Sequence, residues 1–202
     1  MNNIPGQTPI DLLNALCELC GEVTKDLALP VRPERAGGET AERAPKIYRM
    51  DLPKKEDDTK QIPYIIVQVL SGTDVQKPGE QPDCGCGVRI VFGVYSEDMG
   101  EGRLNVLNLI HRVRAELLRR RAIGGNFLLS KQIDWAIDPA NTAPYHFGEM
   151  IMSFEMPPLM PDIPDFVTTG DIKSSTNIFN REEELDWLRK TSKQGNQRAA
   201  LK

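Results

Sequence analysis

Residues 88–118 read VRIVFGVYSED, MGEGR and LNVLNLIHRVRAELL, and this stretch decides the fold. In its first part, apolar residues occupy every second position from Val88 to Val94, which is typical of a strand with one buried face. In its last part, apolar residues recur three or four positions apart from Val106 to Leu117, which predicts an amphipathic helix. We therefore expect this helix to pack on the buried face of the strand.

Upstream, the sequence predicts a second amphipathic helix from Thr8 to about Ala28, with Thr8 as its N-cap and Pro9 in its first turn. Residues 31–60 are polar and predict a long exposed loop interrupted by a short strand at 46–50. The apolar run 64–70 predicts a central strand. The sequence Ser-Gly-Thr-Asp at 71–74 predicts its end, and the Gly- and Pro-rich segment up to Cys86 predicts a loop.

Downstream, Gly124, Gly125 and Asn126 are expected to cap the end of the helix that starts near residue 104. Alternating residues then predict two strands, at 133–137 and 149–156, joined by a turn that contains prolines. The order of elements predicts an α+β domain over residues 1–158, an antiparallel or mixed β-sheet with two amphipathic helices on one face.

Beyond residue 158 the composition changes, and residues 159–202 are expected to form an extended proline-rich arm. A capping-box pattern at Asn180 and Glu183 predicts a short helix at about 180–190 that presents Leu185, Trp187 and Leu188. So short a helix is marginal alone in water. We therefore expect this helix either to be frayed or to dock, on a neighbouring subunit or back on its own domain.

The bulk composition excludes several classes of protein. The chain has 202 residues and a net charge of -4, whereas general nucleic-acid binders need clustered basic residues. No apolar run approaches the roughly 20 residues that span a bilayer, so no membrane association is expected. The N-terminal sequence lacks the features of a signal peptide, which predicts a protein made and kept in a cytoplasm.

The sequence offers no catalytic or cofactor-binding constellation. Cys17 and Cys20 lie three positions apart on the first helix and are interpreted as buried free thiols, whereas Cys84 and Cys86 are interpreted as a surface thiol pair in a loop. A zinc site would require the two pairs to meet. The two histidines, His111 and His146, are interpreted as a surface helix residue and a turn residue. We therefore predict a protein that is not an enzyme and holds no metal or cofactor.

Charged residues suggest contact surfaces instead. The strand pattern places Arg89, Glu149, Ser153 and Glu155 on the sheet face opposite the helices, which could face solvent or line a pore. The run Arg119, Arg120 and Arg121 ends the helix, where cations interact favourably with the helix dipole, and could also contact an acidic partner. The candidate interface residues are Arg89, Glu149, Glu155, Arg119, Arg120, Arg121, Leu185, Trp187 and Leu188.

Three segments within residues 62–158 resemble a family of proteins encoded in the tail modules of phages and prophages of Gram-positive bacteria. They are PYIIVQVLSGTD, the segment VRIVFGVYSEDMGEGRLNVLNLIHRVRAELLRRRAIGGNFLL, and PYHFGEMIMSFEMP with its Gly-Glu dipeptide in the last strand. This family is similar to the tail terminators, or tail-completion proteins. The long loop, the Cys-Gly-Cys segment and residues 159–202 have no match to the family pattern.

The resemblance implies a small α+β fold and a structural virion protein of the tail or neck, assembled in the bacterial cytoplasm. It implies a homo-oligomeric ring, commonly a hexamer, that caps the tail tube and joins it to head-side connector or stopper proteins. DNA would pass through the lumen without specific binding. Two alternatives remain open at this point: a head-side adaptor or stopper in the same neck, and a small cytoplasmic zinc-binding protein that uses the four cysteines.

Overall fold

The computed structural model describes residues 8–33, 41–54, 61–77, 80, 82–140 and 142–158. These residues all belong to one compact unit, Met1–Leu159. The predicted C-terminal arm and its helix at 180–190 lie outside the described residues, and so does much of the predicted loop at 31–60.

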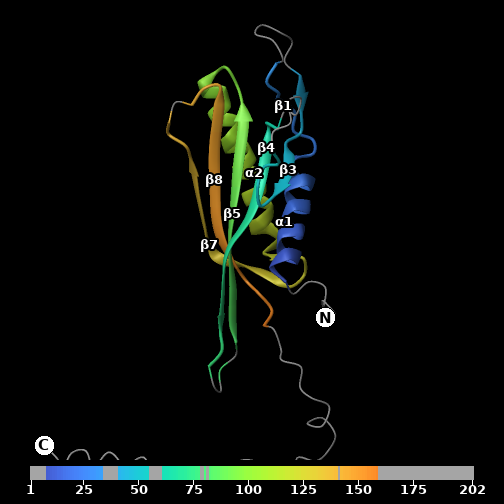
Figure 1. Ribbon diagram of the computed structural model, residues 1–202, viewed down its shortest axis with the longest axis vertical. Coiled ribbons are helices and arrows are strands. Elements are labelled where there is room, and N and C mark those ends of the chain that lie inside the picture. Colours follow the sequence, from blue (N-terminus) through green and yellow to red (C-terminus); the bar gives the residue numbers. More distant parts are fainter. Residues whose placement is uncertain are drawn as a thin grey trace, which may run out of the picture. The chain divides into compact units, whose positions relative to one another are not determined.

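The domain is a mixed β-sheet with two helices, which confirms the α+β prediction (Figure 1). Six strands lie in the order β3-β4-β5-β8-β7-β6, and β1 and β2 form a separate two-stranded sheet. Only β3 and β4 are parallel, so the main sheet is mixed. The elements are α1 (Pro9–Thr24), β1 (Leu29–Pro30), β2 (Glu42–Arg43), β3 (Lys46–Arg49), β4 (Tyr64–Val75), β5 (Asp83–Tyr95), α2 (Met99–Arg120), β6 (Ala122–Ile123), β7 (Phe127–Ile137) and β8 (Tyr145–Glu155).

At the start of each helix, the side chain of the N-cap residue accepts a hydrogen bond from a backbone amide of the first turn. In α1, Thr8 and Asp11 form the capping box: the Asp11 amide donates to Thr8 Oγ1 over 3.2 Å, and the Thr8 amide donates to Asp11 Oδ2 over 3.1 Å. In α2, the Glu101 amide donates to Asp98 Oδ1 over 2.7 Å. The predicted start of α1 is confirmed, with Pro9 in its first turn.

The end of α2 differs from the prediction. Arg121 is the residue that leaves the helix, with a φ of 56°, and its amide donates to the Leu117 carbonyl over 2.9 Å. Gly124 and Gly125 also have positive φ, but they form the turn between β6 and β7. The glycine pair was misread as a helix cap because the two-residue strand β6 is too short to leave a periodic pattern.

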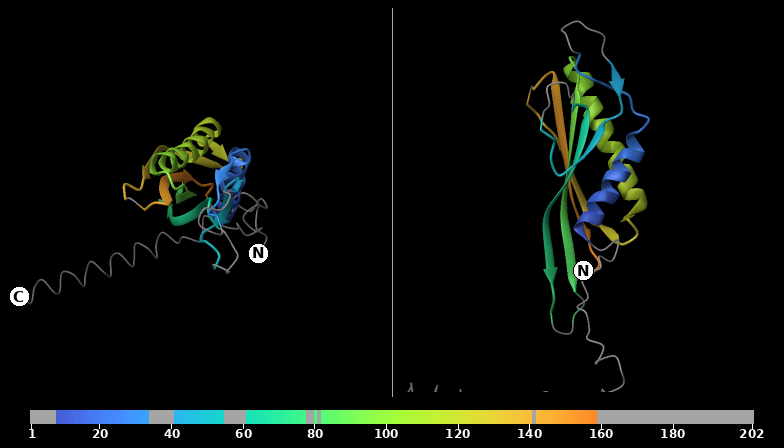
Figure 2. Two further views of the ribbon diagram at one scale, coloured as in Figure 1. Left: turned by 90° about the horizontal axis from the view of Figure 1, so that it is seen from above. Right: turned by 45° about the vertical axis from the view of Figure 1, so that its right-hand side comes forward.

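Both helices cover the same face of the sheet (Figure 2). The apolar stripe of α2 meets the inward residues of β5 and β8, and α1 packs beside α2 against β3 and β4. The predicted alternation in β5 is confirmed, since Val88, Ile90, Phe92 and Val94 are all buried. The other large buried side chains of this core include Leu12, Leu16, Leu109, Ile110, Leu117, Phe127 and Phe154.

Strands β4 and β5 are longer than predicted. Residues 71–75 continue β4 instead of ending it, and they pair with residues 83–87 of β5. The pairing resumes after an irregularity between Val69 and Ser71. Much of the predicted loop therefore extends the β4–β5 pair, and we call residues 71–75 and 83–87 the ribbon. Residues 85–87 also pair with Ser153–Glu155 of β8. Backbone pairing with a distant segment overrides the turn-like composition of Ser-Gly-Thr-Asp.

Two glycines allow α2 to approach the sheet closely. A β-carbon added at Gly148 of β8 would lie 2.6 Å from Val106 Cγ1 and 3.1 Å from Ile110 Cδ1. A β-carbon added at Gly102 of α2 would lie 2.1 Å from the ring of His146. His146 is buried in β8, with Nε2 3.2 Å from the Ser96 carbonyl, so the prediction of a turn residue was wrong. His111 is exposed on α2, as predicted.

We expect Gly148→Ala to lower the free energy of unfolding by about 1–3 kcal/mol, because the added methyl group overpacks the α2–β8 contact. Urea unfolding followed by circular dichroism measures the change. The matched control is Gly85→Ala in β5, where the added atom would meet only the Phe154 carbonyl at 3.7 Å. Equal stability of the two variants would contradict the close contact.

Candidate interaction surfaces

Neither α1 nor α2 lies over the other face of the sheet, which we call the open face (Figure 2). The register places Arg89, Glu149, Ser153 and Glu155 on this face, as predicted, because their neighbours Val88, Met150, Met152 and Phe154 point into the core. Asp134 also lies there, opposite Ile151. Apolar side chains share the face, and Ile151 is 47% exposed. The open face therefore mixes acidic and apolar groups.

Arg89 and Glu149 are the predicted interface residues that the fold brings together. They are diagonal neighbours across β5 and β8, and Arg89 Nε donates to Glu149 Oε2 over 2.7 Å. A second guanidinium nitrogen lies 2.6 Å from the same oxygen. Both side chains are more than one third exposed, so the pair contributes at most about 1 kcal/mol to stability. Glu155 lies six residues further along β8, opposite Gly85, and is separate from this pair.

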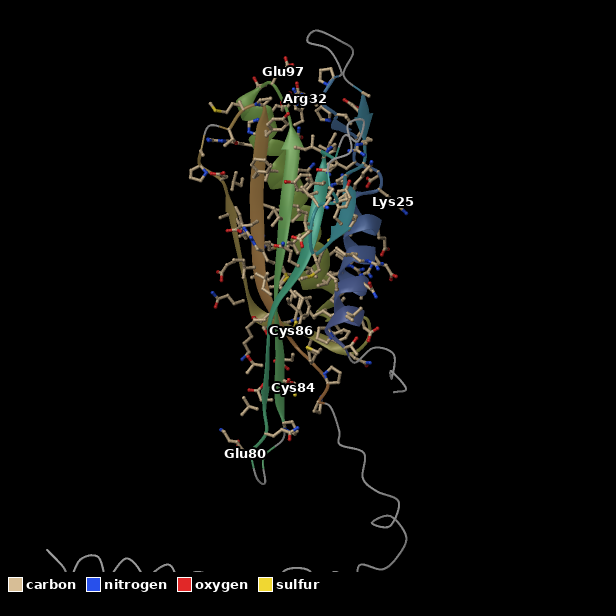
Figure 3. All side chains as sticks on the ribbon, in the orientation of Figure 1. Lys25, Arg32, Glu80, Cys84, Cys86 and Glu97 are labelled. Carbon is tan, nitrogen blue, oxygen red and sulfur yellow. The ribbon has the colours of Figure 1, made fainter. Side chains whose placement is uncertain are left out.

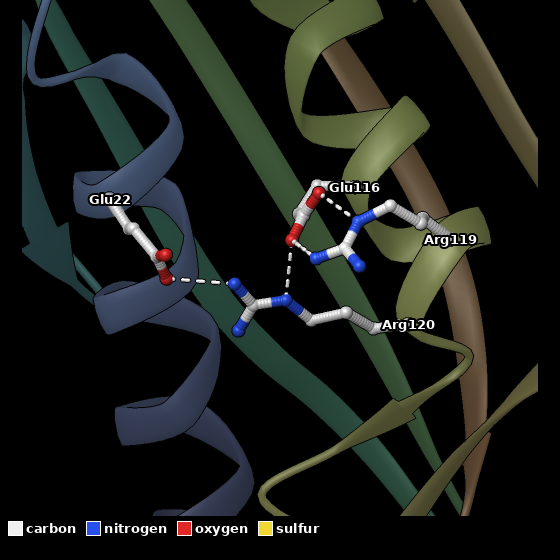
Figure 4. A network of polar contacts seen from close by, with 4 residues as sticks. All are labelled: Glu22, Glu116, Arg119 and Arg120. Atoms are coloured by element: carbon white, nitrogen blue, oxygen red, sulfur yellow. Dashed lines mark hydrogen bonds and ion pairs between the residues drawn. The ribbon is translucent and has the colours of Figure 1, made fainter.

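The arginine run at the end of α2 is largely engaged within the chain (Figure 4). Arg119 and Arg120 both donate to the carboxylate of Glu116, and Arg120 also reaches Glu22 of α1 over 2.8 Å. Arg120 therefore links the two helices. Arg121 is exposed and forms no ion pair with any described residue.

Hydrogen bonds from Arg119 and Arg120 lower the pKa of Glu116 to about 2. A carboxyl whose pKa is lowered in the folded state stabilises that state above its unfolded pKa and loses this contribution as the pH falls. The contribution of Glu116 should thus be complete above about pH 4.5 and lost as the pH approaches about 2.

We expect Glu116→Gln to lower the thermal midpoint at pH 7 by no more than about 3 °C, because the partners are exposed at the surface. The difference from the parent protein should shrink as the pH is lowered from 4.5 towards 2. Differential scanning calorimetry across this pH range checks both points. A difference that is constant with pH would contradict the assigned role of the carboxylate.

All four cysteines are buried free thiols. The interpretation of Cys17 and Cys20 is confirmed, and burial raises the pKa of both thiols. The interpretation of Cys84 and Cys86 as a surface loop pair was wrong. They alternate with Gly85 in β5 and point to the buried side, which continues the period-two pattern of residues 88–94 backwards. That continuation is the signal in the sequence that could have shown the strand.

The described residues contain no group of three or more His, Cys, Asp or Glu side chains placed to hold a metal ion. The cysteine pairs sit on different elements, α1 and β5. Thus the described part of the chain does not supply the four-thiolate site that the zinc alternative requires.

At two edges of the sheet, the outermost strand pairs with only part of its longer neighbour. The sequence did not predict these edges. β3 pairs only with residues 64–67 of β4, so no described strand pairs with the outer edge of β4 from Leu70 to Val75. β6 pairs only with Phe127 and Leu128 of β7, which leaves the outer edge of residues 131–137 without a described strand. Trp135 on that stretch is 45% exposed. Free strand edges are templates for pairing with another chain.

An aromatic and polar cluster lies at the end of the sheet opposite the ribbon (Figure 3). The rings of Tyr95 and Tyr145 meet edge to face with centroids 6.0 Å apart, and Arg32 lies 6.0 Å from the centroid of the Tyr145 ring. The Tyr95 hydroxyl donates to the Glu97 carboxylate over 2.9 Å. Burial is the main cause of the raised pKa of Tyr95. This cluster was not predicted, because Arg32, Tyr95 and Tyr145 are far apart in the chain.

Comparison with known proteins leaves the family open. No protein-family model matches the chain, and no curated protein is detectably similar in sequence. Among the described residues, no helix is both long and apolar enough to cross a membrane. Leu185, Trp187 and Leu188 lie outside the described residues.

Proposed function

We propose that this protein is a structural virion protein that caps the tail tube of a phage as a ring, commonly a hexamer, and joins it to the head-side connector. The proposal rests on the resemblance of residues 62–158 to the tail-terminator family and on one structural observation. That observation is an open sheet face bounded on its two sides by uncovered strand edges.

A closed ring of identical subunits needs two different, mutually complementary surfaces on each subunit. The outer edge of β4 and the outer edge of β7 lie on opposite sides of the sheet order, as such a ring requires. In a head-to-tail arrangement, the β4 edge of one copy would face the β7 edge of the next. The exposed apolar side chains near these edges, Leu70, Val75 and Trp135, would then be buried.

The open face would line the lumen of this ring. Its carboxylates include Asp134, Glu149 and Glu155, and Arg89 is already paired with Glu149. Negative groups on a lumen wall repel the phosphates of DNA and would let it pass without being held. This arrangement accounts for an acidic and partly apolar surface without assigning it any catalytic chemistry.

The experiment is to measure the mass of the full chain by light scattering, alone and with the tail-tube protein of the same phage. We expect a species of six times the 22.6 kDa chain mass, either alone or once the tube is present. A monomer under both conditions would refute the ring. Assembly with head-side connector proteins but not with the tube would favour an adaptor or stopper instead.

We expect Trp135→Lys to abolish this large species while leaving the fold unchanged, because a lysine on a strand edge opposes edge-to-edge pairing. The matched control is Ile10→Lys, which replaces a 65% exposed apolar residue on α1, outside the sheet. Circular dichroism verifies the fold of both variants. If both variants form normal rings, the β7 edge is not part of the interface.

A further inference from the structure

Two edges of the sheet are uncovered over spans of the same length. No described strand pairs with the outer edge of β4 at residues 70–75 or with the outer edge of β7 at residues 132–137. Proteins commonly protect such edges with lysine or proline, and neither residue type occurs in LSGTDV at 70–75 or in QIDWAI at 132–137. Both edges are therefore suited to pairing with another strand.

Hydrogen bonds of β5 show which backbone groups of β4 point outward. Backbone groups of successive residues in a strand point to opposite sides. The Cys84 carbonyl accepts from the amide that follows β8, over 2.8 Å, so the next residue, Gly85, faces β4 and its partner Thr73. Thr73 thus faces β5. The residues on either side of it, Gly72 and Asp74, direct their amide and carbonyl groups away from the sheet.

In β7, the outward backbone groups belong to odd-numbered residues. The Asp138 amide donates to the Phe147 carbonyl of β8 over 3.0 Å, so Asp138 and Ala136 face β8. Trp135 and Ile137 lie on either side of Ala136, and their amide and carbonyl groups therefore point outward. Each free edge thus offers donors and acceptors at every second residue.

The two free edges run in opposite directions. The pairs β4–β5, β5–β8 and β8–β7 are all antiparallel, so β4 and β7 are antiparallel to each other. In a ring whose axis follows the strands, every copy keeps its strand directions, and β4 of one copy meets β7 of the next in antiparallel orientation. This step rests on the proposed ring with the open face towards its axis. The two edges would then be joined by a ladder of backbone hydrogen bonds.

The lengths of the free edges limit the register of this ladder. Registers differ in steps of two residues, because only then do the outward backbone groups meet. Placing Gly72 opposite Trp135 makes residues 70–75 span the whole free edge of β7 defined above. A shift of two residues towards β3 would run β7 into Met50, whose sulfur accepts from the Val69 amide over 3.4 Å.

The size of the side chains favours the same register. Trp135 is opposite the buried Met150, so its indole lies on the helix side of the sheet, and it is 45% exposed. Gly72 is opposite the buried Cys86 and lies on the same side. Among the described residues, only the Gly85 carbonyl, at 3.8 Å, would contact a β-carbon added at Gly72. An indole from the next copy therefore has room over Gly72, and an aromatic ring over a glycine of an edge strand helps to fix the register.

We propose that β4 of one copy pairs with β7 of the next copy in antiparallel orientation, with Gly72 opposite Trp135. Backbone hydrogen bonds join Gly72 to Trp135 and Asp74 to Ile133 across the boundary. The indole of Trp135 covers Gly72 on the helix side. The sheets of neighbouring copies thus form one continuous sheet, and the partner that each edge recognises is a second copy of this chain.

The test is disulfide trapping between copies of the full chain that carry both Ser71→Cys and Ala136→Cys, alone and with the tail-tube protein. The proposal places these two residues directly opposite each other, within disulfide distance. Within one chain they lie on strands three positions apart, about 14 Å, so a disulfide must join two copies. The parent protein is the blank, since its own four thiols are buried.

Two shifted pairs are the matched controls: Ser71→Cys with Asp134→Cys, and Thr73→Cys with Ala136→Cys. All these residues are exposed and lie on the open face. We expect the 71–136 disulfide to form at least about tenfold faster than the disulfide of either control. A control that reacts as fast would overturn the proposal.

Light scattering on the same samples separates the pairing from the ring. Intact rings that form no 71–136 disulfide would overturn the pairing and leave the ring in place. A 71–136 disulfide in open chains of copies would support the pairing and refute the closed ring. A monomer under all conditions would overturn both.

A size exchange tests the contact between Gly72 and Trp135. Gly72→Leu, introduced into the 71–136 pair, should slow trapping at least about tenfold, because leucine occupies the space of the indole. Adding Trp135→Ala should recover part of the lost rate, because it removes the clash. The matched control is Thr73→Leu, which places the same side chain on the open face and should change the rate by less than about twofold. Circular dichroism verifies the fold, and equal rates for Gly72→Leu and Thr73→Leu would overturn the proposal.

Discussion

The contact between α2 and β8 at Gly148 is the constraint on which the rest of the domain depends. No other residue type leaves room for Val106 and Ile110 to sit so close to the strand. Once α2 lies there, its buried stripe covers β5 and β8, and α1 fills the remaining width against β3 and β4. The neighbouring Glu149 points the other way and pairs with Arg89 on the open face. In this dipeptide, Gly148 therefore makes room for α2 on one face of the sheet, and Glu149 forms an ion pair on the other.

Local signals in the sequence were sufficient for the helices and for much of the sheet. The capping box of Thr8 and Asp11 and the apolar stripes of both helices are determined by residues close together in the chain. These signals predicted the α+β class. Likewise, the alternation of β5 and β8 correctly separated the core side from the side that carries Arg89, Glu149 and Glu155.

The remaining features depend on contacts between distant residues, which composition does not reveal. Residues 71–74 have the composition of a turn, yet they form a strand because residues 83–87 supply their hydrogen-bonding partners. His146 looks like a turn residue beside Pro144, but β8 begins at Tyr145 and buries it beneath Gly102. The uncovered edges arise because β3 and β6 are too short to cover their neighbours, a property of the whole sheet.

The ribbon divides the domain into regions of unequal local stability. Residues 70–75 of β4 are exposed and pair only with β5 among the described strands. Residues 84–87 of β5, in contrast, are also paired with the end of β8 and carry the buried Cys84 and Cys86. Only the β4 half of the ribbon can therefore open without disrupting the core. Segments with few buried contacts open at a lower free energy than the core. Amide protons of residues 71–75 should thus exchange with solvent through local fluctuations, whereas those of the central strands should exchange only on global unfolding.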